Sequence, residues 1–257
     1  MKIKCIGSSS SGNCYLMQFA DECTNYKITI MIECGFSWGE IIKKAVEIGA
    51  VDMLQDVSSC LITHGHNDHA KAINQLISNG IDIFTTQEVA NRFNCTEANI
   101  IKDGESYCIA PSLFAYAFKV EHDFPNTMGY VIKCEKTNET ILFVTDCKYY
   151  TQDLSDFKFN YILMECNYDE KMTYSIYNQA KKDNDQLKIK QYERVINSHM
   201  SMASAKKNLK KLNLENTTAI FLLHLSDKNA NEYKMKNEIK NLTNKPVYVC
   251  QKKGGIK

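Results

Sequence analysis

This sequence has few prolines and no segment that resembles a linker. The 257 residues include only 3 prolines and 11 glycines, and no segment combines them in the manner of an interdomain linker. No internal repeat or low-complexity tract interrupts the chain. An α/β chain of this length commonly folds as one unit. We therefore expect a single domain over residues 1–257.

Long apolar segments are also missing. No run approaches the roughly 18 apolar residues that a membrane-spanning helix needs. The first residues, Met-Lys-Ile-Lys-Cys-Ile-Gly, hold no apolar stretch of the length found in secretory signals. These absences predict a cytoplasmic protein with no membrane partner.

Paired cysteine motifs are absent as well, although the chain has 11 cysteines. No Cys-x-x-Cys pair occurs, which excludes a zinc ribbon and a thioredoxin-type redox motif. Many of the cysteines stand in apolar, strand-like runs, where a free thiol acts as a small hydrophobic side chain. This pattern is typical of a reducing environment.

A large excess of one charge is the last missing feature. The formal net charge is +1, so a nucleic acid would have to be bound by a local basic surface. Each short basic run is by itself typical of a solvated helix face. The basic residues that cluster late in the chain are Lys181, Lys182, Lys188, Lys190, Arg194, Lys206, Lys207, Lys210 and Lys211.

What is present is an alternation of short apolar runs and polar, helix-periodic segments. It predicts an α/β sandwich with helices on both outer faces. The predicted strands are Lys2–Ile6, Tyr15–Phe19, Ile28–Ile32, Cys60–Thr63, Ile81–Thr85, Leu113–Val120, Met128–Cys134, Thr140–Thr145, Tyr161–Glu165, Thr218–Leu223 and Val247–Cys250. The predicted helices are Trp38–Ile48, Asp68–Ser78, Gln87–Phe93, Lys171–Lys188, Ser201–Leu212 and Asn229–Asn241.

The most informative segment reads Leu-Ile-Thr-His-Gly-His-Asn-Asp-His-Ala, from Leu61 to Ala70. Two histidines separated by one residue can bind the same ion from an extended segment. An aspartate and a histidine at the start of the following helix can then reach a second ion. Imidazole and carboxylate ligands suit zinc and, with more oxygen, manganese. The four potential ligands are His64, His66, Asp68 and His69.

The remaining histidines strengthen this interpretation, because the chain has only 6 in all. His122, His199 and His224 each come directly after an apolar run that we interpret as a strand. Asp146 ends the apolar run Ile141–Thr145 and is a candidate bridging ligand. Glu165 ends another such run, where capping of a turn is an equally good explanation.

In this order the residues resemble the metallo-β-lactamase superfamily, whose metal signature is His-x-His-x-Asp-His followed by an isolated His, an Asp and a late His. The resemblance implies a four-layer αββα fold with two divalent metal ions, zinc or manganese. It implies that His64, His66 and His122 bind the first ion. It also implies that Asp68, His69 and His224 bind the second ion, and that Asp146 bridges both.

Further matches resemble the YycJ/WalJ-type branch of small exonucleases, versions of which occur in phages of Gram-positive bacteria. The matching segments are Ser8–Leu16, His122-Asp with Gly129-Tyr, Val144-Thr-Asp, Glu165-Cys-Asn, His199-Met-Ser and His224-Leu-Ser. The branch implies a DNA exonuclease of 5′ to 3′ polarity that uses a hydroxide bridging the two metals. A phosphodiesterase that opens cyclic nucleotides and an RNA-processing nuclease remain alternatives, with DNA favoured over RNA as the partner.

Two departures from the branch stand out. Its usual Asp-x-Gly after the third strand is Glu33-Cys-Gly35 here, and its usual His-Leu-Ser is His199-Met-Ser.

Other branches of the superfamily fit less well. Cysteine takes the bridging position in the commonest β-lactamases, whereas here Cys147 only follows Asp146. The segment between Asp146 and His224 is also too short for the cap domain of the β-CASP nucleases.

The residues expected to act in catalysis are His199, Glu165 and Asp68. His199 is left over once the ligands are assigned, so it is our candidate general acid or phosphate donor, oriented by Glu165. A satisfied structural histidine is the alternative for His199. The hydroxyl-rich segment from Ser8 to Asn13 could bind phosphate, which makes Ser10 and Asn13 candidate substrate contacts.

Overall fold

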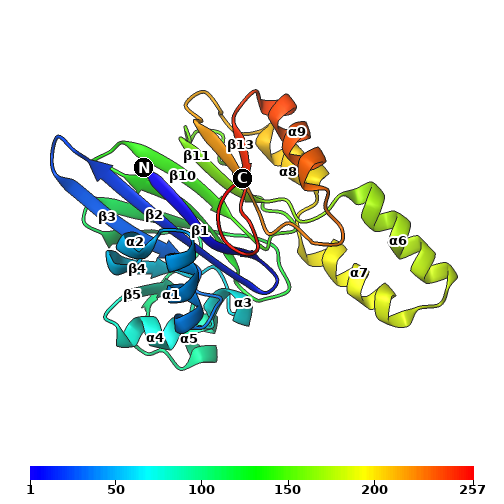
Figure 1. Cartoon of the computed structure of the whole chain (residues 1–257), viewed down its shortest axis with the longest axis horizontal. Helices are drawn as coiled ribbons and strands as arrows, with labels where there is room; N and C mark the ends of the chain where they lie inside the picture. The colour runs from blue at the N-terminus through cyan, green and yellow to red at the C-terminus, as the bar shows by residue number, and fades with distance from the viewer.

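Two β-sheets form the centre of the computed structural model, which describes residues 1–257 (Figure 1). The first sheet has the strand order β1-β2-β3-β4-β5-β6, and the second β13-β12-β11-β10-β9-β8-β7. The strands of the first sheet are β1 (Lys2–Ser9), β2 (Gly12–Asp21), β3 (Tyr26–Ile32), β4 (Val57–Leu61), β5 (Asp82–Thr85) and β6 (Asn99–Ile100). Those of the second are β7 (Ser106–Ala110), β8 (Leu113–Lys119), β9 (Met128–Cys134), β10 (Glu139–Val144), β11 (Tyr161–Glu165), β12 (Ala219–Leu223) and β13 (Val247–Val249).

Both sheets combine an antiparallel part with a parallel part. In the first sheet β1, β2 and β3 pair antiparallel, and β3 to β6 pair parallel. In the second, β7 to β10 are antiparallel and β10 to β13 are parallel. Parallel neighbours need crossover connections, and their carboxyl ends meet at one edge of the sheet. The residues that follow β4, β10, β11 and β12 are therefore brought together at such edges.

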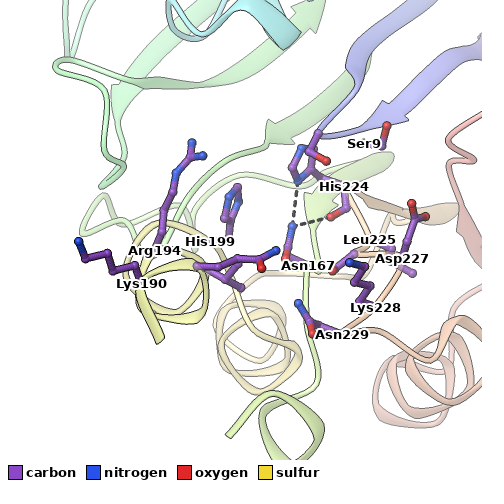
Figure 2. A pocket seen from close by; sticks show the side chains of 14 residues that line it. Ser9, Asn167, Lys190, Arg194, His199, His224, Leu225, Asp227, Lys228 and Asn229 are labelled. Carbon is purple, nitrogen blue, oxygen red and sulfur yellow. Dashed lines mark hydrogen bonds between the residues drawn. The ribbon is translucent and has the colours of Figure 1, made fainter. Parts of the chain in front are cut away.

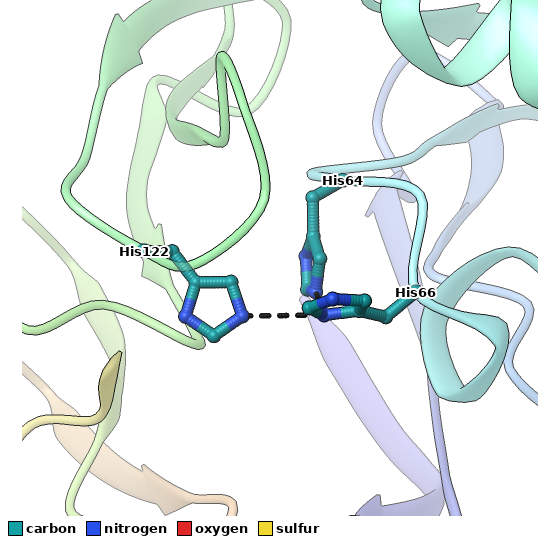
Figure 3. Close-up of side chains that lie close together, drawn as sticks. All are labelled: His64, His66 and His122. Atoms are coloured by element: carbon teal, nitrogen blue, oxygen red, sulfur yellow. Dashed lines mark hydrogen bonds between the residues drawn. The ribbon is translucent and has the colours of Figure 1, made fainter. Parts of the chain in front are cut away.

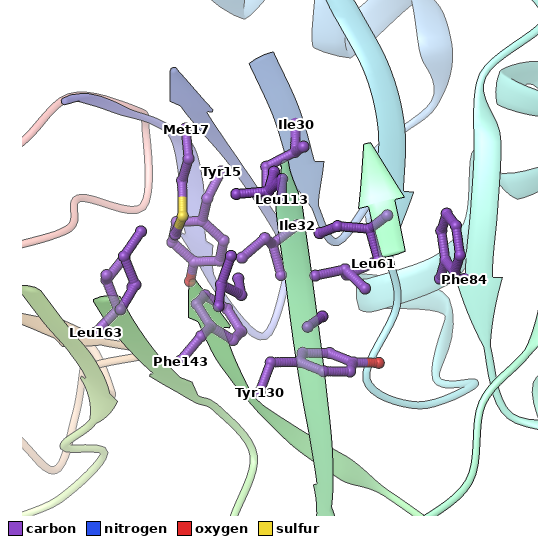
Figure 4. Packing of buried hydrophobic residues seen from close by; sticks show 14 of the residues in the cluster. Tyr15, Met17, Ile30, Ile32, Leu61, Phe84, Leu113, Tyr130, Phe143 and Leu163 are labelled. Carbon is purple, nitrogen blue, oxygen red and sulfur yellow. The ribbon is translucent and has the colours of Figure 1, made fainter. Parts of the chain in front are cut away.

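Alternate side chains of a strand face opposite sides, and this period builds three apolar layers. In β2, Tyr15 and Met17 lie in the cluster between the sheets, whereas Leu16 lies in the cluster on the outer face. In β10, Phe143 faces the centre and Leu142 the outside. The central layer includes an edge-to-face contact of Tyr15 and Phe143, with ring centroids 5.3 Å apart (Figure 4).

Helices cover both outer faces. The outer cluster of the first sheet includes residues of α1 (Trp38–Glu47), α2 (Val51–Gln55), α4 (Ile73–Ser78) and α5 (Gln87–Phe93). The outer cluster of the second sheet includes residues of α8 (Met202–Leu209) and α9 (Glu232–Thr243). The predicted αββα architecture is confirmed. No helix is long and apolar enough to span a membrane.

Two helices stand outside this sandwich. Helices α6 (Glu170–Lys182) and α7 (Gln186–Ser198) form a hairpin that projects from the body in Figure 1, and we call it the arm. None of its residues belongs to the three apolar clusters. The prediction of one helix over Lys171–Lys188 was wrong. The chain breaks at Asn184, which has a φ of 53°, and the Asp185 side chain then caps α7.

Other differences from the predicted elements have local causes. The helix predicted over Asp68–Ser78 is split into α3 (Asn67–Ala70) and α4, because the Ala72 N–H bonds the Cys34 carbonyl at 2.9 Å instead of continuing the helix. Strand β7 was not predicted, although it contains a short apolar run; it is an edge strand in which only Ile109 is buried. Every predicted strand is present, with ends shifted by a few residues.

Candidate metal centre

The candidate residues come from segments far apart in the chain. His64 and His66 lie in the loop between β4 and α3, and the short helix α3 carries Asp68 and His69. His122 follows β8, whereas Asp146 and His224 follow β10 and β12. Ligands from both sheets therefore meet at one edge of the sandwich, and all seven predicted ligands fall into two adjacent groups.

The first group consists of three histidines. His64 Nε2 lies 3.0 Å from His66 Nδ1, and His122 Nε2 lies 3.3 Å from the same His66 nitrogen. Figure 3 shows the three rings pointing toward one another. Three imidazole nitrogens around one point are the donor set of many zinc sites that leave a position open.

The second group combines two carboxylates and two histidines. His69 Nε2 lies 3.3 Å from Asp146 Oδ2 and 3.6 Å from Asp68 Oδ2. His224 Nε2 lies 3.7 Å from Asp146 Oδ1 and 4.0 Å from Asp68 Oδ2. His224 Nε2 is buried and has no hydrogen-bond partner. A cation bound between this nitrogen and the two carboxylates would give the nitrogen the partner that it lacks.

Asp146 lies between the two groups. Besides its contacts to the second group, Asp146 Oδ2 is 3.7 Å from His122 Nε2 and 4.0 Å from His64 Nε2. Its backbone has a φ of 44°, and Glu33 and His224 also have positive φ values, 63° and 53°. This conformation is strained for residues other than glycine. Such strain is concentrated at functional sites, where the surrounding structure holds it in place.

A buried carboxylate holds two of the ligand rings. Glu33 is fully buried and accepts a hydrogen bond from the Thr63 hydroxyl, which in turn contacts His64 Nδ1 at 2.9 Å. The other Glu33 contact is His69 Nδ1, 3.3 Å from Oε1. Carboxylates behind ligand histidines fix the orientation of the ring. Glu33 therefore contacts His69 directly and His64 through the Thr63 hydroxyl.

Two more of the five ligand histidines, His122 and His224, have polar neighbours that were not predicted to hold them. His122 Nδ1 donates to the Ser198 carbonyl at 2.8 Å, and the Asn167 amide contacts His224 Nδ1 at 2.9 Å. Asp123 Oδ1 lies 2.9 Å from His122 Nε2. In the sequence, Asp123 and Asn167 stood out only as members of the matched segments His122-Asp and Glu165-Cys-Asn, and no signal marked Ser198.

Burial and opposing charges set the protonation of this cluster. Burial and the neighbouring histidines hold the pKa of His64 well below its usual range. Burial also opposes the charge of His69, but Asp146 and Glu33 outweigh it and raise the pKa of His69. The pKa of Asp146 is lowered despite burial, because His224 and His69 favour its charged form.

Beside the ligands, Glu165 and His199 form a close pair. Glu165 Oε1 is 2.7 Å from His199 Nδ1, and His199 lines a cavity of about 550 Å³ next to His224 (Figure 2). Burial would raise the pKa of Glu165, but the contact with His199 outweighs it and lowers the pKa. The prediction that His199 follows a strand was wrong, since Val195–Ser198 is the last turn of α7.

The two predicted substrate contacts differ in their surroundings. Ser10 is exposed and lines the same cavity. Asn13 is fully buried, and its amide nitrogen contacts the Ser9 carbonyl at 3.0 Å and His69 Nε2 at 3.0 Å. This geometry supports a role for Asn13 in positioning His69, whereas Ser10 remains available to a ligand.

The donor set fits a pair of divalent cations. Neutral imidazoles and shared carboxylates are the ligands that zinc and manganese take in proteins. Each group offers at least three such atoms within 4.8 Å of one another. A sandwich with this ligand set at one edge defines the class of metal-dependent hydrolases.

The comparisons with known proteins agree with that class. The family model for the beta-lactamase superfamily domain matches residues 29–224, and the chain belongs to this family. No curated protein sequence matches the chain.

Solved structures share the fold at low sequence identity. YhfI from Bacillus subtilis, a metallo-beta-lactamase fold protein, is 16% identical with a TM-score of 0.64, and the match covers 99% of this chain and 98% of YhfI. Zn²⁺-bound PqqB from Methylobacterium extorquens is 10% identical with a TM-score of 0.70, covering 100% and 99%. The short form of human tRNase Z is 13% identical with a TM-score of 0.61, covering 100% and 98%.

Proposed function

We propose that this chain is a dinuclear-metal phosphodiesterase, a DNA exonuclease that works from the 5′ end. The observation that carries the proposal is the position of Asp146, which faces both ligand groups at once. A carboxylate shared in this way suits two adjacent ions. Bound there, zinc or manganese ions would act as Lewis acids toward a phosphoryl oxygen and toward water.

The protein's own residues complete the chemistry. His199 uses Nδ1 to contact Glu165, which leaves Nε2 as the free nitrogen of a ring that lines the cavity. From there it can donate a proton to the oxygen that leaves the phosphorus, or a hydrogen bond to a phosphoryl oxygen. Glu165 fixes the orientation of that ring through its contact with Nδ1.

Two structural neighbours act on phosphates, which supports a phosphodiester substrate. One is the short form of human tRNase Z and another is a diphosphatase from the PhnP family. Cationic side chains beside the cavity, among them Lys190, Arg194 and Lys228, suit a polyanion. The DNA preference and the polarity rest on the branch resemblance of the sequence.

The test uses DNA labelled at the 5′ end or the 3′ end, with protein loaded with zinc or manganese. We expect early release of short products from the 5′ end and none with the His66→Ala variant. Parallel reactions with RNA and with cyclic mononucleotides distinguish the alternative substrates. Equal cleavage by His66→Ala, or no cleavage of any phosphodiester, would contradict the proposal.

A further inference from the structure

The arm contributes one wall of the cavity beside the metal centre. Lys190 and Arg194 are four residues apart on α7, so they lie on the same face of that helix, and both line the cavity. The cavity also reaches His199 and His224 (Figure 2). A bound molecule that touches His199 can therefore extend along α7.

The opposite wall comes from the segment between β12 and α9. Lys228 and Asn229 line the cavity from this side, and Figure 2 places Lys228 across from α7, with His199 between them. Ser10 adds a hydroxyl from the β1–β2 turn. Cationic side chains thus flank His199 on two sides.

Not all charges at the cavity are free. Arg194 Nε donates to Asp123 at 2.9 Å, and Asp227 pairs with Lys252. Lys190 and Lys228 are exposed and have no carboxylate within ion-pairing distance. These two lysines therefore give the cavity two cations that no acidic side chain of the protein neutralises.

The remaining lining has little to offer a nucleobase. Only two of the 14 lining residues are apolar, Val195 and Leu225, and no Phe, Tyr or Trp is among them. Proteins that bind bases of single strands usually stack them on such rings. A polar wall with free ammonium groups instead suits phosphates and sugars, whose contacts carry no sequence information. A cavity of about 550 Å³ holds a few nucleotide units but not a duplex.

We propose that Lys190 and Lys228 bind backbone phosphates on either side of the phosphate that faces His199, so that the cavity takes a single DNA strand without regard to its sequence. This inference rests on the proposed function of the metal centre, and it identifies the substrate as a polynucleotide rather than a mononucleotide. The arm is then the element that extends the site along the strand.

The test measures binding separately from cleavage. Fluorescence anisotropy of a labelled single-stranded phosphorothioate DNA of about 12 nucleotides, which resists cleavage, is recorded with metal-loaded protein over a series of salt concentrations. We expect Lys190→Gln and Lys228→Gln each to weaken binding about fivefold and to reduce the slope of log affinity against log salt by about 0.7. Lys190→Arg keeps the charge and should bind like the unmodified protein.

Lys43→Gln is the matched control, because Lys43 is exposed on α1 and does not line the cavity. The inference fails if the unmodified protein shows no binding, or if both glutamine variants match it in affinity and slope. Cleavage of end-labelled DNA by metal-loaded protein is scored separately. If the protein cleaves DNA but the two glutamine variants bind it unchanged, only this inference is contradicted. If the glutamine variants bind more weakly but the protein cleaves no DNA, only the proposed function is contradicted.

Discussion

Glu165 and His199 form an oriented pair, with Glu165 Oε1 2.7 Å from His199 Nδ1. The other carboxylate oxygen of Glu165 accepts hydrogen bonds from the backbone N–H groups of Cys147, at 2.7 Å, and Met200, at 3.1 Å. The carboxylate is therefore fixed on both sides, and it fixes the ring in turn. His199 Nδ1 also lies 4.0 Å from Asp146 Oδ2, so the pair adjoins the second ligand group.

His199→Ala should lower the turnover number on a phosphodiester by about 10²- to 10⁴-fold, because the proton donor is lost. Metal content should stay at the level of the unmodified protein. Steady-state kinetics and mass-spectrometric metal analysis on the same preparation check both expectations. A purely structural histidine would instead give a loss of thermal stability with little change in turnover.

The two ligand groups should respond differently to substitution. His66→Ala removes a nitrogen from the first group alone, so we expect bound metal to fall by about one equivalent per chain. Asp146→Ala removes the carboxylate that faces both groups, so we expect a loss of about two equivalents. Metal analysis after dialysis against metal-free buffer measures the difference. Identical losses in the two variants would contradict a shared Asp146.

Glu33→Gln tests the support of the ligand rings. The amide keeps the size of the side chain but removes the charge that faces His69 Nδ1. We expect metal affinity to fall about 10- to 100-fold, as is typical for the outer partner of a ligand histidine. Competition with a chromogenic chelator measures the affinity. Glu47→Gln, at an exposed glutamate near the end of α1, should leave it unchanged.

Gly35 and Gly39 are a matched pair of glycines. A Cβ at Gly35 would come within 1.7 Å of the Asp68 carbonyl oxygen, so Gly35→Ala must displace the loop that carries the ligands. We expect a loss of about 1–3 kcal/mol in the free energy of unfolding, together with weaker metal binding. A Cβ at Gly39 meets nothing within 4 Å and stands in α1, so Gly39→Ala should stabilise by about 0.5 kcal/mol. Denaturant unfolding of both variants checks the opposite signs.

Acid should weaken the start of α1. Glu40 accepts hydrogen bonds from the side chain and backbone of Ser37, which lower its pKa from 4.5 to about 2. Because the folded pKa lies below the unfolded one, this stabilisation is complete above about pH 4.5 and is lost as the pH falls toward 2.

Glu40→Gln is the variant that tests this acid dependence. It should cost about 0.5 kcal/mol at pH 7, since solvent screens an exposed group, and progressively less at pH 4 and 3. Denaturant unfolding at the three pH values measures the gap. A gap independent of pH would contradict the role of the charge.

Much of this architecture could be predicted from the sequence, because each core strand is an apolar run that can be identified without knowledge of the other strands. The parallel pairing of β11 with β12 was not predicted, because three helices separate these strands in the chain and no local pattern relates them. Strand β7 is an edge strand with an exposed Cys108, and its short apolar run was not interpreted as a strand. Val195 and Ile196 suggested a strand, but the His199 N–H bonds the Val195 carbonyl and ends a helix.

The ligand residues could be predicted because histidine is rare here and its spacing is distinctive. The groups that hold them could not, because Ser198 acts through its backbone carbonyl and the role of Asn167 depends on its contact with His224, which is distant in the chain. Glu33 was visible only as a departure from the branch. Lys190 could not be separated from the other residues of the basic stretch, where Lys206 is paired with Glu238 at 2.7 Å, and Lys228 lies outside that stretch.

The ligands come from both halves of the sandwich, His64 and His69 from the first sheet and its helix, and His122, Asp146 and His224 from the second. Ions bound between them would act as a reversible cross-link between the two sheets. The chain has no disulfide to do this, because its eleven cysteines are all free. Loading or stripping the metals would then govern how readily the two halves part, so that resistance to heat and proteases becomes a gauge of metal supply.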